Sequence, residues 1–232
     1  MGSNKETPTS TLPQRVLAEF VGTLFLVAAV IGSGIMAERL AGGNVALALL
    51  ANTIATGAAL VALIYAFGPI SGGHFNPAVT VSAALAREFV WMEVPPYALA
   101  QIAGGMLGAV TAHLMFGLRW YSLSVHARSG AAQGLSEFVA TFGLLAVIWG
   151  CMRARPDAVA IAVGCYITSA YWFTASTSFA NPAVTLARTL SDTFAGIRPA
   201  DAPLFIVAQF AGATCATWLF KPSRVRVEET KV

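Results

Sequence analysis

The sequence Asn-Pro-Ala-Val-Thr occurs twice, at Asn76–Thr80 and at Asn181–Thr185, each time at the edge of an apolar run. Asparagine is a preferred residue just before a helix, and proline is favoured at the first helical position, where its missing N–H costs no hydrogen bond. Each Asn-Pro pair therefore marks a helix start. An Asn whose side-chain oxygen caps its own helix still presents amide N–H groups, which are donors that a solute can use.

The two helices that follow are predicted near residues 77–87 and 182–190. At 1.5 Å per residue they are about 16 and 14 Å long, so each covers about half of a bilayer. A pair of such half-helices has a use only if longer elements hold them inside a membrane.

The composition supplies those longer elements. Of 232 residues, 56% are apolar and only 11% are charged, which is far fewer charges than in soluble proteins. Six apolar runs are long enough to cross a bilayer and are predicted as membrane spans. They are Pro13–Met36, Val45–Phe67, Pro95–Gly117, Ala131–Met152, Asp157–Ala175 and Ala202–Phe220.

Other segments of the two halves also match. The stretch AEFVGT in the first span returns as SEFVAT in the fourth, and AQIAGG in the third returns as AQFAGA in the sixth. Three spans per half force the second copy to enter the membrane with opposite polarity. The sequence thus predicts an all-α membrane protein with six transmembrane helices and two re-entrant half-helices in an inverted 3+3 repeat.

The predicted segments divide the chain into two repeats with polar flanks. Residues 1–12 and 222–232 are expected to be cytoplasmic tails, 13–117 and 131–221 the repeats, and 118–130 an extracellular connecting loop. With both termini cytoplasmic, nine Lys and Arg residues lie inside and five outside, in agreement with the bias of membrane proteins.

In an inverted repeat the half-helices enter from opposite faces, so Asn76 and Asn181 can meet near the midplane. Non-helical backbone at that depth is tolerated only beside protein or a wet cavity. The two positive helix ends would also repel cations. These conditions favour a water-filled pore.

The motifs resemble the aquaporin, or major intrinsic protein, superfamily over nearly the whole chain. The resemblance rests on two NPA motifs, Asn76-Pro77-Ala78 and Asn181-Pro182-Ala183, on SGGHFNPAVT, and on the repeated AEF..T and AQ..G patterns. It implies a homotetramer in membrane lipid, with one pore per subunit that passively conducts water or small uncharged solutes. A bacterial inner membrane is the expected location.

The resemblance also implies a selectivity filter, which in the family is a constriction on the outer side of the NPA pair. Its four positions fall at Thr56, Ser169, Ser178 and Val184. The assignment of Ser169 assumes no gap between it and Asn181. The family usually has arginine at the place of Val184, and some bacterial aquaglyceroporin-like channels associated with arsenite passage look similar in lacking it. A filter without a guanidinium or a bulky ring is predicted to be wide, passing glycerol, urea and neutral metalloids such as arsenous acid as well as water.

Other polar residues have a functional and a structural interpretation. Glu19 and Glu137 could relay protons, but the resemblance implies that they accept hydrogen bonds from the NPA loops. His74 could gate by protonation, or tie its loop to neighbouring backbone. Arg188 could reach the filter, or pair with Asp192 at an outer rim, and we favour the rim.

Several function classes are disfavoured. The sequence contains no Ser/His/Asp pattern, phosphate-binding glycine loop or metal-ligand cluster, so an enzyme, a cofactor and a metal site are not expected. Nucleic-acid binding is not expected either, because membrane topology explains the modest net charge of +3 better. Two alternatives to a wide channel stay open. One is a water-selective pore, and the other is a secondary active transporter, which can also be built from inverted repeats.

Overall fold

The computed structural model describes residues 10–221, and within them the chain forms helices and no strand. The predicted tails, apart from residues 10–12, lie outside the described residues. The helices are α1 (Leu12–Leu40), α2 (Val45–Ser71), α3 (Pro77–Leu85), α4 (Val94–Met115), α5 (Ala131–Ala154), α6 (Val159–Phe173), α7 (Pro182–Arg188) and α8 (Ala202–Phe220). Single 3-10 turns precede α4, α6 and α8, at Trp91–Glu93, Pro156–Ala158 and Pro199–Asp201.

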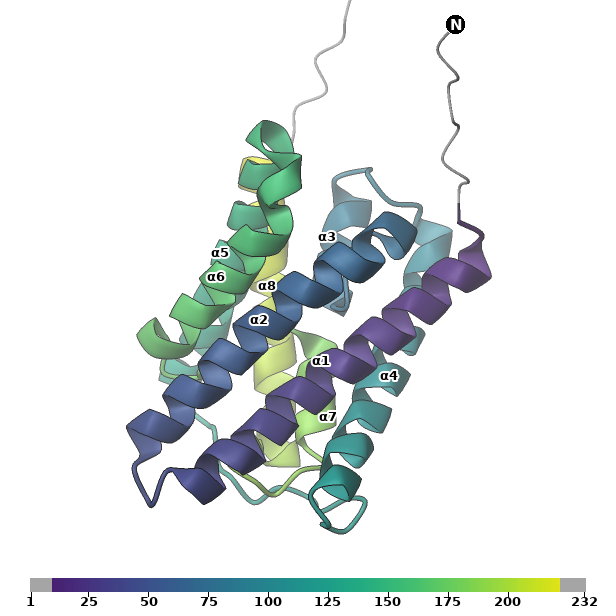
Figure 1. Ribbon diagram of the computed structural model, residues 1–232. Coiled ribbons are helices and arrows are strands. Elements are labelled where there is room, and N and C mark those ends of the chain that lie inside the picture. The colour runs from purple at the N-terminus through teal and green to yellow at the C-terminus, as the bar shows by residue number, and fades with distance from the viewer. Residues whose placement is uncertain (1–9, 222–232) are drawn as a thin grey trace, which may run out of the picture.

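Six long helices form a tilted bundle around the short helices α3 and α7 (Figure 1). In the first repeat α1 packs against α2 and α4, and in the second α5 packs against α6 and α8. The repeats meet where α2 contacts α6 and where α3 contacts α7. The start of α1 and the end of α8 lie at the same end of the bundle (Figure 1). The predicted fold class is therefore confirmed.

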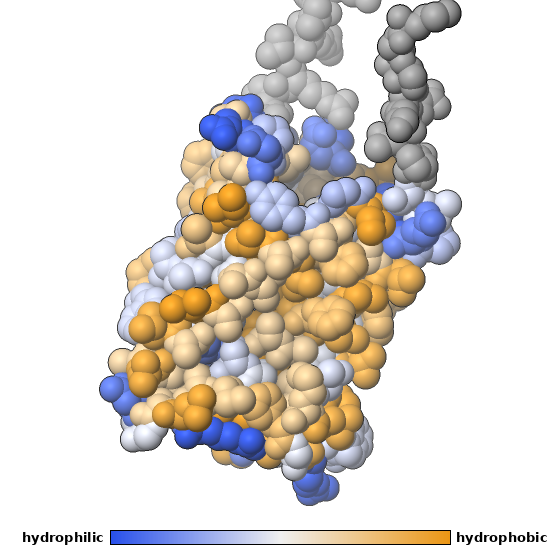
Figure 2. Space-filling view, viewed as in Figure 1, coloured by the Kyte–Doolittle hydropathy of each residue, from blue (hydrophilic) through white to orange (hydrophobic). Residues whose placement is uncertain are grey.

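The surface matches a membrane environment. Figure 2 shows a broad hydrophobic band across the middle of the molecule, with hydrophilic residues gathered at both ends. Within the described residues, five helices are long and apolar enough to cross a bilayer. The sixth, α6, has 15 residues and is about 22 Å long. It is shorter than the predicted span Asp157–Ala175 because a 3-10 turn precedes it and extended backbone follows at Thr174.

The half-helices end slightly earlier than predicted. After α3 the chain turns at Arg87, whose φ of 64° is left-handed and cannot continue a helix. After α7 the carbonyl oxygens of Thr189 and Leu190 accept hydrogen bonds from the backbone N–H groups of Ser124 and Ser122. The connecting loop thus takes the acceptors that another turn of α7 would have used.

Glycines of the two AQ..G motifs set the helix spacing in both repeats. A Cβ added to Gly104 on α4 would collide with the carbonyl oxygen of Phe20 on α1. In the second repeat a Cβ on Gly212 of α8 would collide with the carbonyl oxygen of Phe138 on α5. Small residues permit such backbone contacts between helices in lipid. The closest helix pairs of the two repeats are thus built alike.

We predict that Gly104→Ala destabilises the protein, because the new methyl group would push α4 away from α1. Overpacking of this kind costs about 1–3 kcal/mol. Gly150→Ala is the matched control, since a Cβ there meets no atom within 4 Å and alanine favours the helix. Thermal unfolding of the detergent-solubilised protein measures both. Equal midpoints for the two variants would contradict the proposed close packing.

Candidate functional site

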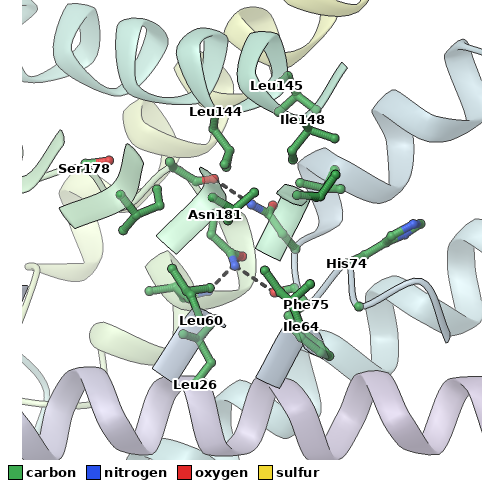
Figure 3. A pocket seen from close by; sticks show the side chains of 18 of the residues that line it. Leu26, Leu60, Ile64, His74, Phe75, Leu144, Leu145, Ile148, Ser178 and Asn181 are labelled. Atoms are coloured by element: carbon green, nitrogen blue, oxygen red, sulfur yellow. Dashed lines mark hydrogen bonds between the residues drawn. The ribbon is translucent and has the colours of Figure 1, made fainter. Parts of the chain in front are cut away.

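Residues of both repeats line a cavity of about 230 Å³ in the middle of the bundle. Its wall is largely aliphatic, and Figure 3 shows side chains from α1, α2 and α5 pointing into it. These are Leu26, Leu60, Ile64, Leu144, Leu145 and Ile148. The polar lining residues are His74, Asn76, Ser178 and Asn181 on the two loops that lead into α3 and α7, and Thr56, Glu88, Tyr171 and Arg188 elsewhere. Their positions decide what the cavity can bind.

Asn76 and Asn181 both line the cavity and link the two half-helices, and Figure 3 shows the side chain of Asn181. The side-chain oxygen of each caps its own helix, accepting from the N–H of Ala78 at 2.9 Å and of Ala183 at 2.9 Å. The side-chain nitrogen of Asn76 donates to the carbonyl oxygen of Ala180 at 2.7 Å, and that of Asn181 donates to the carbonyl oxygen of Phe75 at 2.7 Å. Each amide carries two N–H groups and uses one in this way, so the second is available to a solute.

The loops reach this arrangement through unusual backbone. Phe75 and Ala180, which supply the two acceptor carbonyls, each have a φ of 48°. Ser178, with a φ of 49°, is also in the left-handed region. Such conformations cost about 1–3 kcal/mol per residue without glycine and persist only where the surroundings impose them. The two buried glutamates supply that constraint.

Glu19 on α1 holds the first loop. One carboxylate oxygen accepts from the hydroxyl of Ser71 at 2.7 Å and from the backbone N–H of His74 at 2.9 Å. The other accepts from the backbone N–H of Phe75 at 2.6 Å and from the side-chain amide of Gln101 at 2.7 Å. The loop contacts expected of Glu19 are therefore present.

Glu137 on α5 repeats the arrangement for the second loop. Its carboxylate accepts from the backbone N–H groups of Phe179 and Ala180, both at 2.9 Å, and from the side-chain amide of Gln209 at 2.6 Å. Both carboxylates are fully buried. Since protein donors surround each one, they act as acceptors for the loops and not as free ligands in the cavity.

His74 lines the cavity on the side of Asn181 away from Ser178 (Figure 3). Its imidazole Nδ1 lies 3.1 Å from the hydroxyl oxygen of Thr80, and its ring packs edge-on against Phe89. The backbone N–H of His74 donates to Glu19, so both the backbone and the side chain of the residue contact neighbouring groups. These contacts are those of the structural interpretation.

Three of the four filter positions expected from the sequence come together. Thr56, Ser178 and Val184 are buried and line the same cavity. The hydroxyl oxygen of Ser178 is buried with no hydrogen-bond partner among the described residues. The described residues therefore leave this hydroxyl without a hydrogen bond next to the cavity.

Ser169 does not line the cavity, and its assignment was wrong. Its side chain is exposed, its hydroxyl donates to the carbonyl oxygen of Tyr166, and it shares an exposed face of α6 with Trp172. Tyr171 lines the cavity instead and donates from its hydroxyl to Thr56 Oγ1 at 3.4 Å. Two positions along a helix are a rotation of about 200°, so the ungapped count selected the wrong face. The sequence signal was the apolar stripe Val159, Val163, Ile167 and Tyr171 at four-residue spacing.

Arg188 also departs from the favoured interpretation. It does not pair with Asp192, whose carboxylate instead accepts from the backbone N–H of Val125 at 3.0 Å. The helix ends at Arg188, so the i, i+4 relationship does not exist. Arg188 is only 2% exposed and lines the cavity, with its guanidinium carbon 3.4 Å from the centre of the Phe179 ring.

Comparison with known proteins gives consistent matches. The family profile described as Major intrinsic protein matches residues 6–158 and 152–231. The aquaglyceroporin AqpS of Rhizobium meliloti (strain 1021) is 52% identical over 223 residues, covering 94% of this chain and 95% of that protein. Aquaporin NIP1-4 of Oryza sativa subsp. japonica is 36% identical over 227 residues, covering 95% of this chain and 80% of that protein. The X-ray structure of the aquaglyceroporin from Plasmodium falciparum superimposes with a TM-score of 0.74 at 19% identity, covering 91% of this chain and 96% of that one, which shows a shared fold.

We predict that Glu137→Gln lowers the thermal stability of the solubilised protein. Glutamine has nearly the same shape but turns an N–H₂ group toward backbone and amide donors, leaving a buried donor unpaired at a cost of about 1–3 kcal/mol. Glu19→Gln should behave alike, whereas Glu38→Gln, at an exposed position, should not. Equal unfolding temperatures for all three variants would show that the two carboxylates do not hold the loops.

Proposed function

The chain belongs to the major intrinsic protein family, and from this premise we propose that it conducts small uncharged solutes passively through the cavity between its NPA loops. Members of this family are channels and not enzymes, and the chain is an integral membrane protein. The proposed solutes are water, glycerol, urea and neutral metalloid hydroxides such as arsenous acid.

The observation that carries the proposal is the pair of Asn amides in an aliphatic cavity. Asn76 and Asn181 offer N–H donors at its centre, while their own oxygens are held by the helices they cap. A neutral solute with hydroxyl or carbonyl oxygens recovers hydrogen bonds there as it leaves water. An ion that enters the cavity does not regain the hydration free energy that it loses, because the rest of the wall is mostly apolar.

The proposed filter consists of Thr56, Tyr171, Ser178 and Val184, with Tyr171 replacing Ser169. Val184 brings neither charge nor N–H donors to this ring, and Ser178 is small. The Tyr171 hydroxyl donates to the Thr56 hydroxyl, so these two filter residues are held by a hydrogen bond to each other and not by an arginine side chain. Tyr171 brings to this ring a bulky aromatic side chain that the filter expected from the sequence lacked. The room that we expect for solutes larger than water, which argues against a water-selective pore, therefore rests on Val184 and Ser178.

The transporter alternative finds no support at the centre of the bundle. A coupled transporter would need an acidic or unwound-backbone site for its ion. Here the carboxylates of Glu19 and Glu137 accept hydrogen bonds from the loops and from glutamines. Their lone pairs are thus already used by the fold.

The proposal extends to the assembly and the membrane. We propose a homotetramer in a bacterial inner membrane, with both termini cytoplasmic. The exposed apolar side chains of α2, among them Leu47, Leu50 and Ile54, suit contact with lipid or a neighbouring subunit.

Stopped-flow measurements on proteoliposomes test the function. We expect glycerol, urea and arsenous acid to enter in proportion to their gradients and without effect of a proton uncoupler. Empty liposomes are the control. Flux that saturates at low concentration and collapses with the uncoupler would support the transporter instead.

Val184→Arg tests the filter. A guanidinium adds volume, charge and five N–H donors to the ring, so glycerol flux should fall about tenfold or more while water flux falls less. Val184→Leu, which adds volume without charge, is the matched control. Glycerol flux unchanged in Val184→Arg would remove Val184 from the filter.

A further inference from the structure

Arg188 is a buried charged residue that forms no salt bridge within residues 10–221. In the part of the chain that the structure describes, the salt bridges are Arg15–Glu93, Arg155–Asp157 and Arg198–Asp201. Arg188 is in none of them, although it is only 2% exposed. Its Nη1 is buried with no hydrogen-bond partner among the described residues. Buried charges in membranes are costly and usually face a functional cavity, as this one does.

The guanidinium is fixed in place by neutral groups. Its Nε donates to the carbonyl oxygen of Ala195, and its carbon lies 3.4 Å from the centre of the Phe179 ring. The Phe179 backbone is held by Glu137, and its ring packs edge-on against Phe205 at 5.1 Å. A cation on a ring face keeps its charge while losing part of its hydration. The positive charge is thus presented to the cavity and not neutralised.

A second guanidinium reinforces the potential at this end. Arg128, on the connecting loop, lies over the same Phe179 ring at 5.2 Å and donates to the carbonyl oxygens of Gly196 and Ser176. On the same loop, the pKa of His126 is lowered from its usual value, first by burial and then by the charges of Arg128 and Arg188. The two arginines therefore act together on a neighbouring group.

We propose that Arg188 is the residue that excludes cations from this channel. It lies one helical turn beyond Val184, so its charge acts on the cavity from behind the filter ring without occupying it. Width and charge selectivity are then set by different residues, Val184 for width and Arg188 for charge. This inference rests on the proposed function, because it concerns which solutes the same cavity rejects.

Urea and guanidinium are the solutes that test it. They have the same planar shape and nearly the same size, but guanidinium carries a charge at every usable pH. The ratio of guanidinium to urea permeability, measured in proteoliposomes of the full chain, therefore reports charge selectivity alone. We expect a low ratio for the wild type.

Arg188→Gln should raise this ratio about tenfold or more, because a unit charge a few ångströms from the path is removed. Arg188→Lys keeps the charge and should leave the ratio within about threefold of wild type. Arg39→Gln is the matched control. Arg39 also lies over a ring, that of Phe116, but it is exposed and does not line the cavity, so the ratio should not change.

Two results would overturn the inference. One is an unchanged ratio in Arg188→Gln, which would leave Arg188 only the structural task of holding the Ala195 carbonyl. The other needs no variant and holds even if Arg188→Gln does not fold: a wild type that admits guanidinium as readily as urea has no cation barrier. A wild-type protein that passes neither urea nor any other neutral solute would contradict the proposed function itself. That result differs from the two results that overturn the role of Arg188.

Discussion

The structure depends on the contact between the starts of the two half-helices. Asn76 donates a hydrogen bond to the loop that precedes Asn181, and Asn181 donates one to the loop that precedes Asn76. Each asparagine caps its own helix with oxygen and reaches the opposite loop with nitrogen. One side chain thereby fixes the start of its helix, the distance between the helices and the direction of the donors in the cavity. The six long helices can be understood as the frame that makes this contact possible inside a membrane.

The strained backbone of the two loops is stabilised by the buried glutamates. The carbonyls that the asparagines need are presented by residues with left-handed backbone, Phe75 and Ala180. Charge-assisted hydrogen bonds from their N–H groups to Glu19 and Glu137 hold that conformation. An acidic residue deep in a membrane protein is often a proton or ion ligand. Here its oxygens accept hydrogen bonds from the backbone and from glutamine amides, so these carboxylates are not free ligands in the cavity.

Much of this could be predicted from the sequence because the signals were local or repeated. The Asn-Pro pairs identified both helix starts, hydropathy identified the spans, and the matching halves gave the inverted topology. Helix ends were less accurate, since the end of α7 depends on the Thr189 and Leu190 carbonyls being used by a loop distant in sequence. Hydropathy alone has no information about such a contact.

The misplaced site residues have a related cause. Ser169 was selected by counting from Asn181, but the intervening loop is not helical, and the count lost the rotational phase of α6. The four-residue stripe that ends at Tyr171 retained that phase. Arg188 was interpreted as if its helix continued to Asp192. Its real partner is the Phe179 ring, on a separate loop, and one sequence gives no spacing rule for such a contact.

The crossed bonds of the two asparagines also bear on how the protein is made. While the first repeat enters the bilayer during synthesis, the acceptor for the Asn76 amide, the Ala180 carbonyl, has not yet been translated. In a nascent chain that has inserted only three spans, the hydrogen bond from the Asn76 amide to the Ala180 carbonyl therefore cannot form, and the contact between the two helix starts has to await the second half.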